Sequence, residues 1–210
     1  QSFSSFEKIC DVESTINETR INDAKVDPYG GIVFGTYNED PDKINRKPIA
    51  NLYRLAPDLS LTHLLSNITV SNGIAFSQNE NIMYFADTPT GRIQKFKYSQ
   101  GFKKLNELDS NIIFKDVGEP DGATVDINNN YWSARVRGKC IISIDTKSEK
   151  ILDKINLPTN TPTCVTFGGN NLSSLYVTSL RADPTNDNEG GNLHRIETDT
   201  RGFEQLLADI

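Results

Sequence analysis

One pattern occurs four times along this chain and constrains its fold more than any other feature. Each copy has a polar residue, a short apolar stretch, a turn rich in Gly, Asn or Pro, and a second apolar stretch with an aromatic residue. The copies begin at Asn22, Asn72, Asp121 and Thr163, and their turns begin five residues later at Asp27, Ser77, Asp126 and Gly168. Successive copies are 50, 49 and 42 residues apart. Strand–turn–strand units at this spacing are typical of β-propellers, whose blades repeat every ~40–50 residues.

The repeat predicts where the strands lie. We expect inner strands near 23–27, 73–77, 122–126 and 164–168. Further segments with strand-like residue patterns lie at 91–98, 139–145 and 192–198, and they would supply the outer strands of four-stranded blades. Helical periodicity is nearly absent. The sequence therefore predicts an all-β chain, with residues 1–210 forming a single β-propeller domain of about four to five blades.

Equivalent positions in successive blades lie at equal distances from the central channel of a propeller. The four repeated polar residues would then meet at the mouth of that channel. Such residues also cap ordinary turns. Because all four share one register, a shared polar site and ordinary turn capping are about equally well supported. Carboxylate and amide oxygens suit a hard cation. His63 and His194 lie in segments with alternating, strand-like patterns, so we expect packed or half-exposed strand residues rather than ligands. No motif for a Ser or Cys nucleophile is present.

Composition excludes several classes of protein. Asp and Glu number 28 against 22 Lys and Arg, a net charge of -6 that argues against nucleic acid. No apolar run approaches the ~18 residues of a membrane helix. Cys10, Cys140 and Cys164 are odd in number and far apart, which predicts neither a disulfide framework nor a metal site. We expect a cytoplasmic monomer with no membrane or nucleic-acid partner.

Four segments also resemble one known family. They are RINDAKVDPYGGIVFGT (20–36), SNGIAFSQNENIMYFADTPTGRIQKFKY (71–98), PDGATVDINNNYWSAR (120–135) and PTCVTFGGNNLSSLYVTS (162–179). They resemble successive blocks of the senescence marker protein/regucalcin/gluconolactonase family, and the match runs from about Arg20 to His194. The resemblance implies a six-bladed β-propeller with one divalent metal ion in its channel. Many members of the family hydrolyse sugar lactones.

The resemblance also implies roles for particular residues. Asn72 and Asp121 would be metal ligands, and Asp121 would also act as catalytic base toward water. Arg20 and Asn22 would bind the substrate, and Asp40, beside Glu39, would bind sugar hydroxyls. The metal could be Ca²⁺, Zn²⁺, Mn²⁺ or Mg²⁺.

The resemblance leaves three functions open. The first is a metal-dependent hydrolase of sugar lactones. The second is a non-catalytic, calcium-binding propeller of the regucalcin type, and in the third the polar positions are purely structural. The presence of both Arg20 and Asn22 favours the enzyme, because a protein that only binds metal does not need residues that bind a sugar.

Two departures from the family pattern matter. Ala24 replaces a Gly, which could disturb a backbone of positive φ. Six blades would need about 270 residues, whereas this chain has 210. The family's first metal ligand is a Glu in the blade before Arg20, and neither Glu13 nor Glu18 has its context. We therefore expect a further blade, carrying a third ligand, upstream of Gln1.

Overall fold

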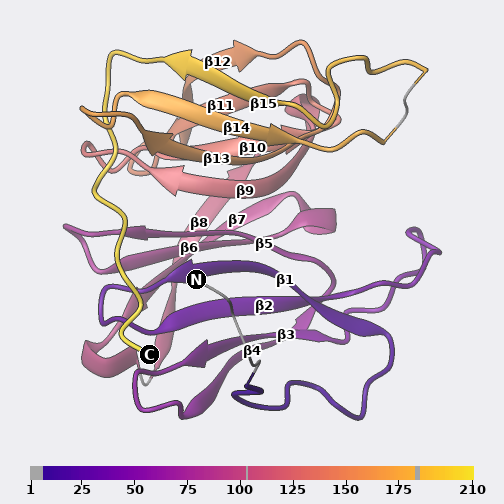
Figure 1. The fold of residues 1–210 in the computed structure, drawn as a ribbon, viewed down its shortest axis with the longest axis vertical. Coiled ribbons are helices and arrows are strands. Elements are labelled where there is room, and N and C mark those ends of the chain that lie inside the picture. Colours follow the sequence, from indigo (N-terminus) through magenta and orange to yellow (C-terminus); the bar gives the residue numbers. More distant parts are fainter. Residues whose placement is uncertain (1–6, 103, 183–184) are drawn as a thin grey trace.

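The computed structural model describes residues 7–102, 104–182 and 185–210. Within them the chain forms fifteen strands in four antiparallel sheets that follow one another along the sequence. Figure 1 shows the first sheet at one end of the longest axis, and the third and fourth sheets, which overlap in this view, at the other end. Each sheet is a meander in which strands adjacent in the chain are hydrogen-bonded neighbours. The expected all-β fold is confirmed, with four propeller blades.

The first blade contains β1 (Thr19–Val26), β2 (Ile32–Asn38), β3 (Ala50–Leu55) and β4 (Leu61–Ile68). The second contains β5 (Ser71–Ser77), β6 (Ile82–Asp87), β7 (Arg92–Tyr98) and β8 (Leu105–Ile113). The third contains β9 (Glu119–Val125), β10 (Tyr131–Val136), β11 (Cys140–Asp145) and β12 (Lys150–Asn156). The fourth contains β13 (Pro162–Gly168), β14 (Ser174–Ser179) and β15 (Leu193–Glu197).

Helix is confined to three single turns of 3-10 type in the described residues. They are η1 (Thr88–Thr90), η2 (Gln100–Phe102) and η3 (Lys115–Val117). None of these turns could cross a bilayer, and the described part of the chain has no other helix that could.

The four predicted inner strands are confirmed as β1, β5, β9 and β13. Each begins two to four residues before its predicted start. The strand-like segments that follow the repeats are confirmed as β7, β11 and β15. The spacing of the repeat therefore identified the correct strand at the start of every blade.

The core lies between the blades, in three layers of buried apolar side chains. Side chains alternate across a strand, so a central strand contributes to two layers. In β6, Met83 and Phe85 pack toward the first blade, whereas Tyr84 and Ala86 pack toward the third. Each large apolar side chain buried in this way contributes about 1.5–3 kcal/mol. The inner and central strands are rich in apolar residues because both of their faces are buried.

The C-terminal segment, residues 201–210, crosses the turn ends of all four blades. The Arg201 carbonyl accepts the Ile127 amide, and the Gly202 amide donates to the Leu172 carbonyl. Further along, the Glu204 carbonyl accepts Gln78 Nε2, and the Asp209 amide donates to the Gly30 carbonyl. Figure 1 shows this yellow segment returning from the fourth blade to the first. It therefore ties together blades that are far apart in sequence.

Candidate metal and substrate site

Every inner strand has a β-bulge at or next to its repeated polar residue. In β1, Ile21 pairs with Thr36 and Ala24 pairs with Phe34, so Asn22 and Asp23 oppose a single residue of β2. Comparable shifts fall between Asn72 and Ala75, between Pro120 and Ala123, and between Pro162 and Cys164. The sequence pattern placed these residues just before the strands, whereas the structure places them inside. A bulge bends its strand and re-aims a side chain, and bulges are frequent beside functional sites.

Backbone conformation at the bulges differs between Ala24 and Gly73. Ala24 is not among the described residues of positive φ, so its replacement of a family Gly costs nothing there. Gly73 has a φ of +65°, and a Cβ at that position would lie 2.4 Å from Tyr131 Oη. Tyr131 Oη donates to the Gly73 carbonyl at 2.9 Å. Only glycine fits the bulge that follows Asn72.

A hydrogen-bonded chain joins the predicted residues of three blades. Asn22 Nδ2 donates to the carbonyl that precedes Asn72 (2.7 Å) and to Asn72 Oδ1 (3.0 Å). Asn72 Nδ2 donates to Thr88 Oγ1, which in turn donates to the Pro120 carbonyl, both at 2.8 Å. Pro120 immediately precedes Asp121. The structure thus links Asn22 directly to Asn72, and Asn72 to the strand segment that carries Asp121.

Two carboxylates lie at these bulges with few hydrogen-bond donors. Asp121 Oδ1 accepts the Gly122 amide at 2.9 Å, and Asp23 Oδ2 accepts the Ile74 amide at 2.9 Å. Burial raises the pKa of Asp121 to about 7, and the charges of Asp23 and Glu119 add to this effect. Burial also raises the pKa of Asp23 to about 6. The site concentrates negative charge that a cation would neutralise.

The Cys164 thiol on β13 lies near the same carboxylates. A Cβ built on Gly122 would lie 2.6 Å from Cys164 Sγ, so β9 and β13 approach closely there. Burial raises the pKa of the Cys164 thiol, and the charges of Asp23 and Asp121 raise it further. The thiol therefore stays protonated at neutral pH beside the carboxylates.

Arg20 and Asp40 lie on the first blade with different partners. Arg20 Nη2 pairs with Glu39 Oε1 at 2.9 Å, and both side chains are partly exposed. Asp40 Oδ1 instead accepts the Asp42 amide within the loop that follows β2. A cavity of about 780 Å³ lies beside Arg20, Thr36 and the N-terminal segment. Neither Asn72 nor Asp121 lines this cavity, so it brings Arg20 together with the N-terminal segment rather than with the two predicted metal ligands.

The fourth repeated residue and the N-terminal acids have structural partners. Thr163 Oγ1 shares a hydrogen bond of 2.9 Å with Thr178 Oγ1 in its own blade. Glu13 Oε1 accepts the hydroxyls of Thr36 and Tyr53, on β2 and β3. The Glu18 carbonyl accepts the Glu39 amide. Glu13 Oε1 is therefore engaged with the middle strands of the first blade.

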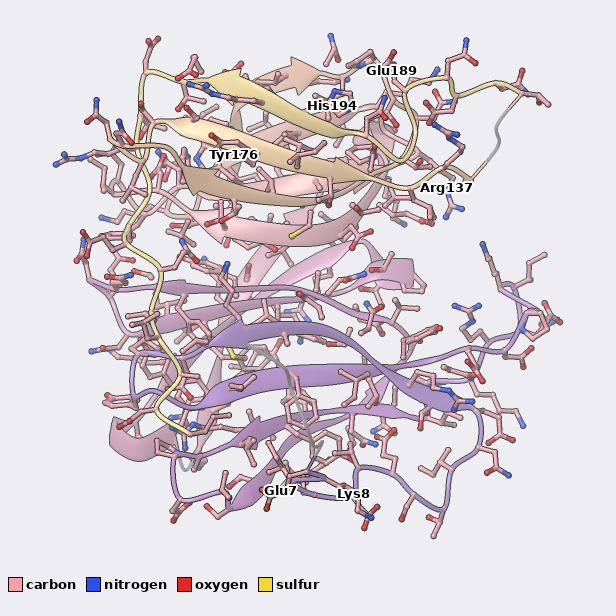
Figure 2. The ribbon with its side chains drawn as sticks, viewed as in Figure 1. Glu7, Lys8, Arg137, Tyr176, Glu189 and His194 are labelled. Carbon is pink, nitrogen blue, oxygen red and sulfur yellow. The ribbon has the colours of Figure 1, made fainter. Side chains whose placement is uncertain are left out.

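The histidines and cysteines form no metal cluster in the part of the chain that the structure describes. His63 lies on β4, where its ring packs edge-on against Tyr53. Figure 2 shows His194 on β15, in the last strand of the fourth blade. The three cysteines are free thiols. Both histidines lie on strands, as their sequence context predicts, with His63 exposed and His194 half-buried.

Comparison with known proteins now decides the family. The family model of the SMP-30/Gluconolactonase/LRE-like region matches residues 2–181. The chain belongs to this family. The match includes all four inner-strand bulges and most of the fourth blade, and it contains Asn22, Asp23, Asn72 and Asp121.

Named relatives include lactonases and regucalcins. The chain is 31% identical to a 6-deoxy-6-sulfogluconolactonase of Pseudomonas putida, over 83% of this chain and 59% of that protein. It is 34% identical to regucalcin of Danio rerio, over 77% of this chain and 54% of that protein. A solved structure of a luciferin-regenerating enzyme matches with a TM-score of 0.88 and 31% identity, covering 99% of this chain and 71% of that one. The chain thus spans little more than half the length of these two curated relatives.

Sequence reasoning missed two residues of this site. Asp23 lies in the family-like segment 20–36, but the sequence predicted no role for it, because its hydrogen bond to Ile74 of the next blade has no sequence signature. Thr88 follows the strand after Asn72, where a Thr before Pro signals only a turn. The available sequence signal for Thr88 was its position directly after β6, the second strand of its repeat.

Proposed function

We propose that this chain carries the metal- and substrate-binding residues of a metal-dependent hydrolase of sugar lactones. The observation that supports it best is the pair of partly buried carboxylates, Asp23 and Asp121, at the bulges of the first and third blades. Their hydrogen bonds come from backbone amides alone, and burial raises the pKa of each. Titratable groups perturbed by burial and by a like charge cluster at functional sites.

The donor set fits a hard divalent cation. Asn72 Oδ1 and the Asp121 carboxylate would hold it, and Asp23 would add negative charge nearby. Oxygen donors of this kind are shared by Ca²⁺, Mg²⁺ and Mn²⁺ sites, and Zn²⁺ accepts them as well. When bound, such an ion would polarise the lactone carbonyl and acidify a water molecule.

The protein's own groups would divide the remaining work. Asp121 Oδ2 accepts no hydrogen bond from the described residues, so it is free to take a proton from water. Asn22 would hold Asn72 through its Nδ2 and offer its Oδ1 to a hydroxyl of the substrate. Arg20, with Glu39 and Asp40 near it, would bind sugar hydroxyls and so position the carbonyl. Attack by water needs no covalent intermediate, which agrees with the absence of a nucleophile motif.

The similarity to regucalcin favours a second candidate, a propeller that binds a divalent cation without catalysis. Both candidates need Asn72 and Asp121. They differ over Arg20, since an ion store gains nothing from a group that binds sugar hydroxyls.

The test compares Asp121→Asn with Asp109→Asn, an exposed carboxylate on β8. Metal binding is measured by calorimetry with each of the four cations, and hydrolysis with a panel of aldonolactones. The chain and the complete open reading frame that encodes it are both assayed. We expect Asp121→Asn to lower hydrolysis by orders of magnitude and to weaken metal binding, with Asp109→Asn unchanged.

Two outcomes would contradict the enzyme. Tight metal binding without hydrolysis of any aldonolactone would replace it with the regucalcin-type function. Equal metal binding by the wild type and Asp121→Asn would remove Asp121 from the site altogether.

A further inference from the structure

The Thr88 hydroxyl stands between the two predicted metal ligands. It accepts Asn72 Nδ2 and donates to the Pro120 carbonyl, both at 2.8 Å. We propose that Thr88 is a positioning residue that fixes which end of the Asn72 amide faces the metal site. This inference rests on the proposed function, since it requires Asn72 to be a ligand.

The direction of these hydrogen bonds follows from the donors available. The Pro120 carbonyl can only accept, so the single hydroxyl proton of Thr88 is used there. Toward Asn72 the Thr88 oxygen is then an acceptor, and it must meet the NH₂ end of the amide. The Oδ1 end is thereby turned to the opposite side, where Asn22 Nδ2 donates to it at 3.0 Å. The network therefore distinguishes the two ends of the Asn72 amide.

Orientation of this amide decides whether Asn72 can bind a cation. The Oδ1 atom has two lone pairs, and Asn22 uses one of them. The other remains for a metal ion. A flipped amide would instead present two N–H donors, which repel a cation.

The backbone of Thr88 is itself held in place. Its amide donates to the Val70 carbonyl at 3.0 Å, just before β5. The turn that follows is closed by Gly91, whose amide donates to the Thr88 carbonyl at 3.1 Å. Thr88 is therefore tied to the second blade through its backbone and to the third blade through its hydroxyl. The Thr88 side chain therefore holds both the Asn72 amide and the backbone of Pro120, which precedes Asp121.

The experiment deletes the hydroxyl while keeping the size of the side chain. Thr88→Val is compared with Thr88→Ser, which restores a hydroxyl, and with Thr90→Val. Thr90 lies in the same turn, and its hydroxyl donates to the Asp87 carbonyl rather than to Asn72. Thr88→Ala serves as a second deletion if the valine is too large for the turn.

The first measurement is the affinity for Mn²⁺. Loss of a group that orients a ligand typically lowers metal affinity by about 10–100-fold, and we expect a loss of about tenfold in Thr88→Val. We expect Thr88→Ser to stay within about twofold of the wild type and Thr90→Val to be unchanged. Equal Mn²⁺ affinity in Thr88→Val and the wild type would overturn the role of Thr88 while leaving the proposed function intact.

The second measurement needs no metal. The side-chain amide resonances of Asn72, identified by their absence in Asn72→Asp, should shift in Thr88→Val and return in Thr88→Ser. Unmoved resonances in Thr88→Val would refute the orientation. A wild type that binds no metal overturns the proposed function and this role together, whatever the resonances do.

Discussion

The two ends of the inner strands carry similar polar residues, but the protein uses them differently. At the turn ends, Asp27 and Asp126 are almost completely buried, and their oxygens are saturated. Asp126 accepts the amides of Asn128 and Asn130 and the indole N–H of Trp132. Asp27 accepts the Tyr29 amide and forms an ion pair with Arg54, with Nε and Oδ2 2.6 Å apart.

At the bulge ends, Asp23 and Asp121 are only partly buried yet lack such partners. Only backbone amides bind these carboxylates, that of Gly122 at Asp121 and those of Ile74 and Ala24 at Asp23. No Arg or Lys forms an ion pair with either among the described residues, and burial raises the pKa of both. The comparison shows that register alone does not reveal function. A saturated carboxylate stabilises the fold, whereas a carboxylate left short of donors is a candidate for binding or catalysis.

Removing a saturated carboxylate should have the largest effect on stability. Asp27→Ala would leave the Arg54 guanidinium buried without its partner, and breaking a buried pair in this way costs about 3–5 kcal/mol. Urea denaturation measures this loss, with Asp109→Ala as a surface control expected to stay within about 0.5 kcal/mol. A loss no larger than that of the control would mean that the turn ends are not the structural ends.

Asp121→Asn should have the opposite sign in metal-free protein. The folded chain disfavours the ionised Asp121, and an amide removes that cost. A rise of its pKa from 3.8 to about 7 corresponds to a gain of about 1–4 kcal/mol at pH 8. Thermal unfolding in EDTA measures it. Clear destabilisation by Asp121→Asn would place Asp121 with the saturated group.

The metal-free protein should also lose stability as pH rises. Asp23 and Asp121 have folded pKa values of about 6 and about 7, above the ordinary value of 3.8. Between these values the folded state binds more protons than the unfolded state, so this contribution is present at about pH 4 and is lost as pH rises through 6 to 7. Unfolding in EDTA from pH 5 to 8 should show this loss in the wild type, and less of it in Asp121→Asn. Identical slopes for the two proteins would argue against the raised pKa of Asp121.

Arg20→Ala should have the smallest effect on stability. Its ion pair with Glu39 is exposed, and exposed pairs contribute about 0–1 kcal/mol. Metal affinity should be nearly unchanged, whereas lactone hydrolysis should show a raised KM with a smaller change in kcat. Steady-state kinetics separates the two parameters. An unchanged KM would leave Arg20 as a surface residue and favour the regucalcin-type function.

The sequence by itself determined the blades and the repeated polar residues. Spacing of 42 to 50 residues, alternation of apolar side chains and turn residues at fixed offsets are local properties, so they can be read along the chain. Asn72 and Asp121 followed from the same repeat and from the family motifs. Their sharing of one cation stays a prediction.

Tertiary structure decided which of these polar groups are satisfied. Within single blades, Asp27 forms an ion pair with Arg54, and Asn72 donates a hydrogen bond to Thr88. Across blade boundaries, Asp23 accepts the Ile74 amide, and Thr88 donates to the Pro120 carbonyl. The bulges, absent from the sequence prediction, aim these side chains. A hydrogen bond is short and directional, so a shift of one strand register would exchange its partner. The sequence therefore predicts which residues recur, and only the packing of blades determines which carboxylates remain free to act.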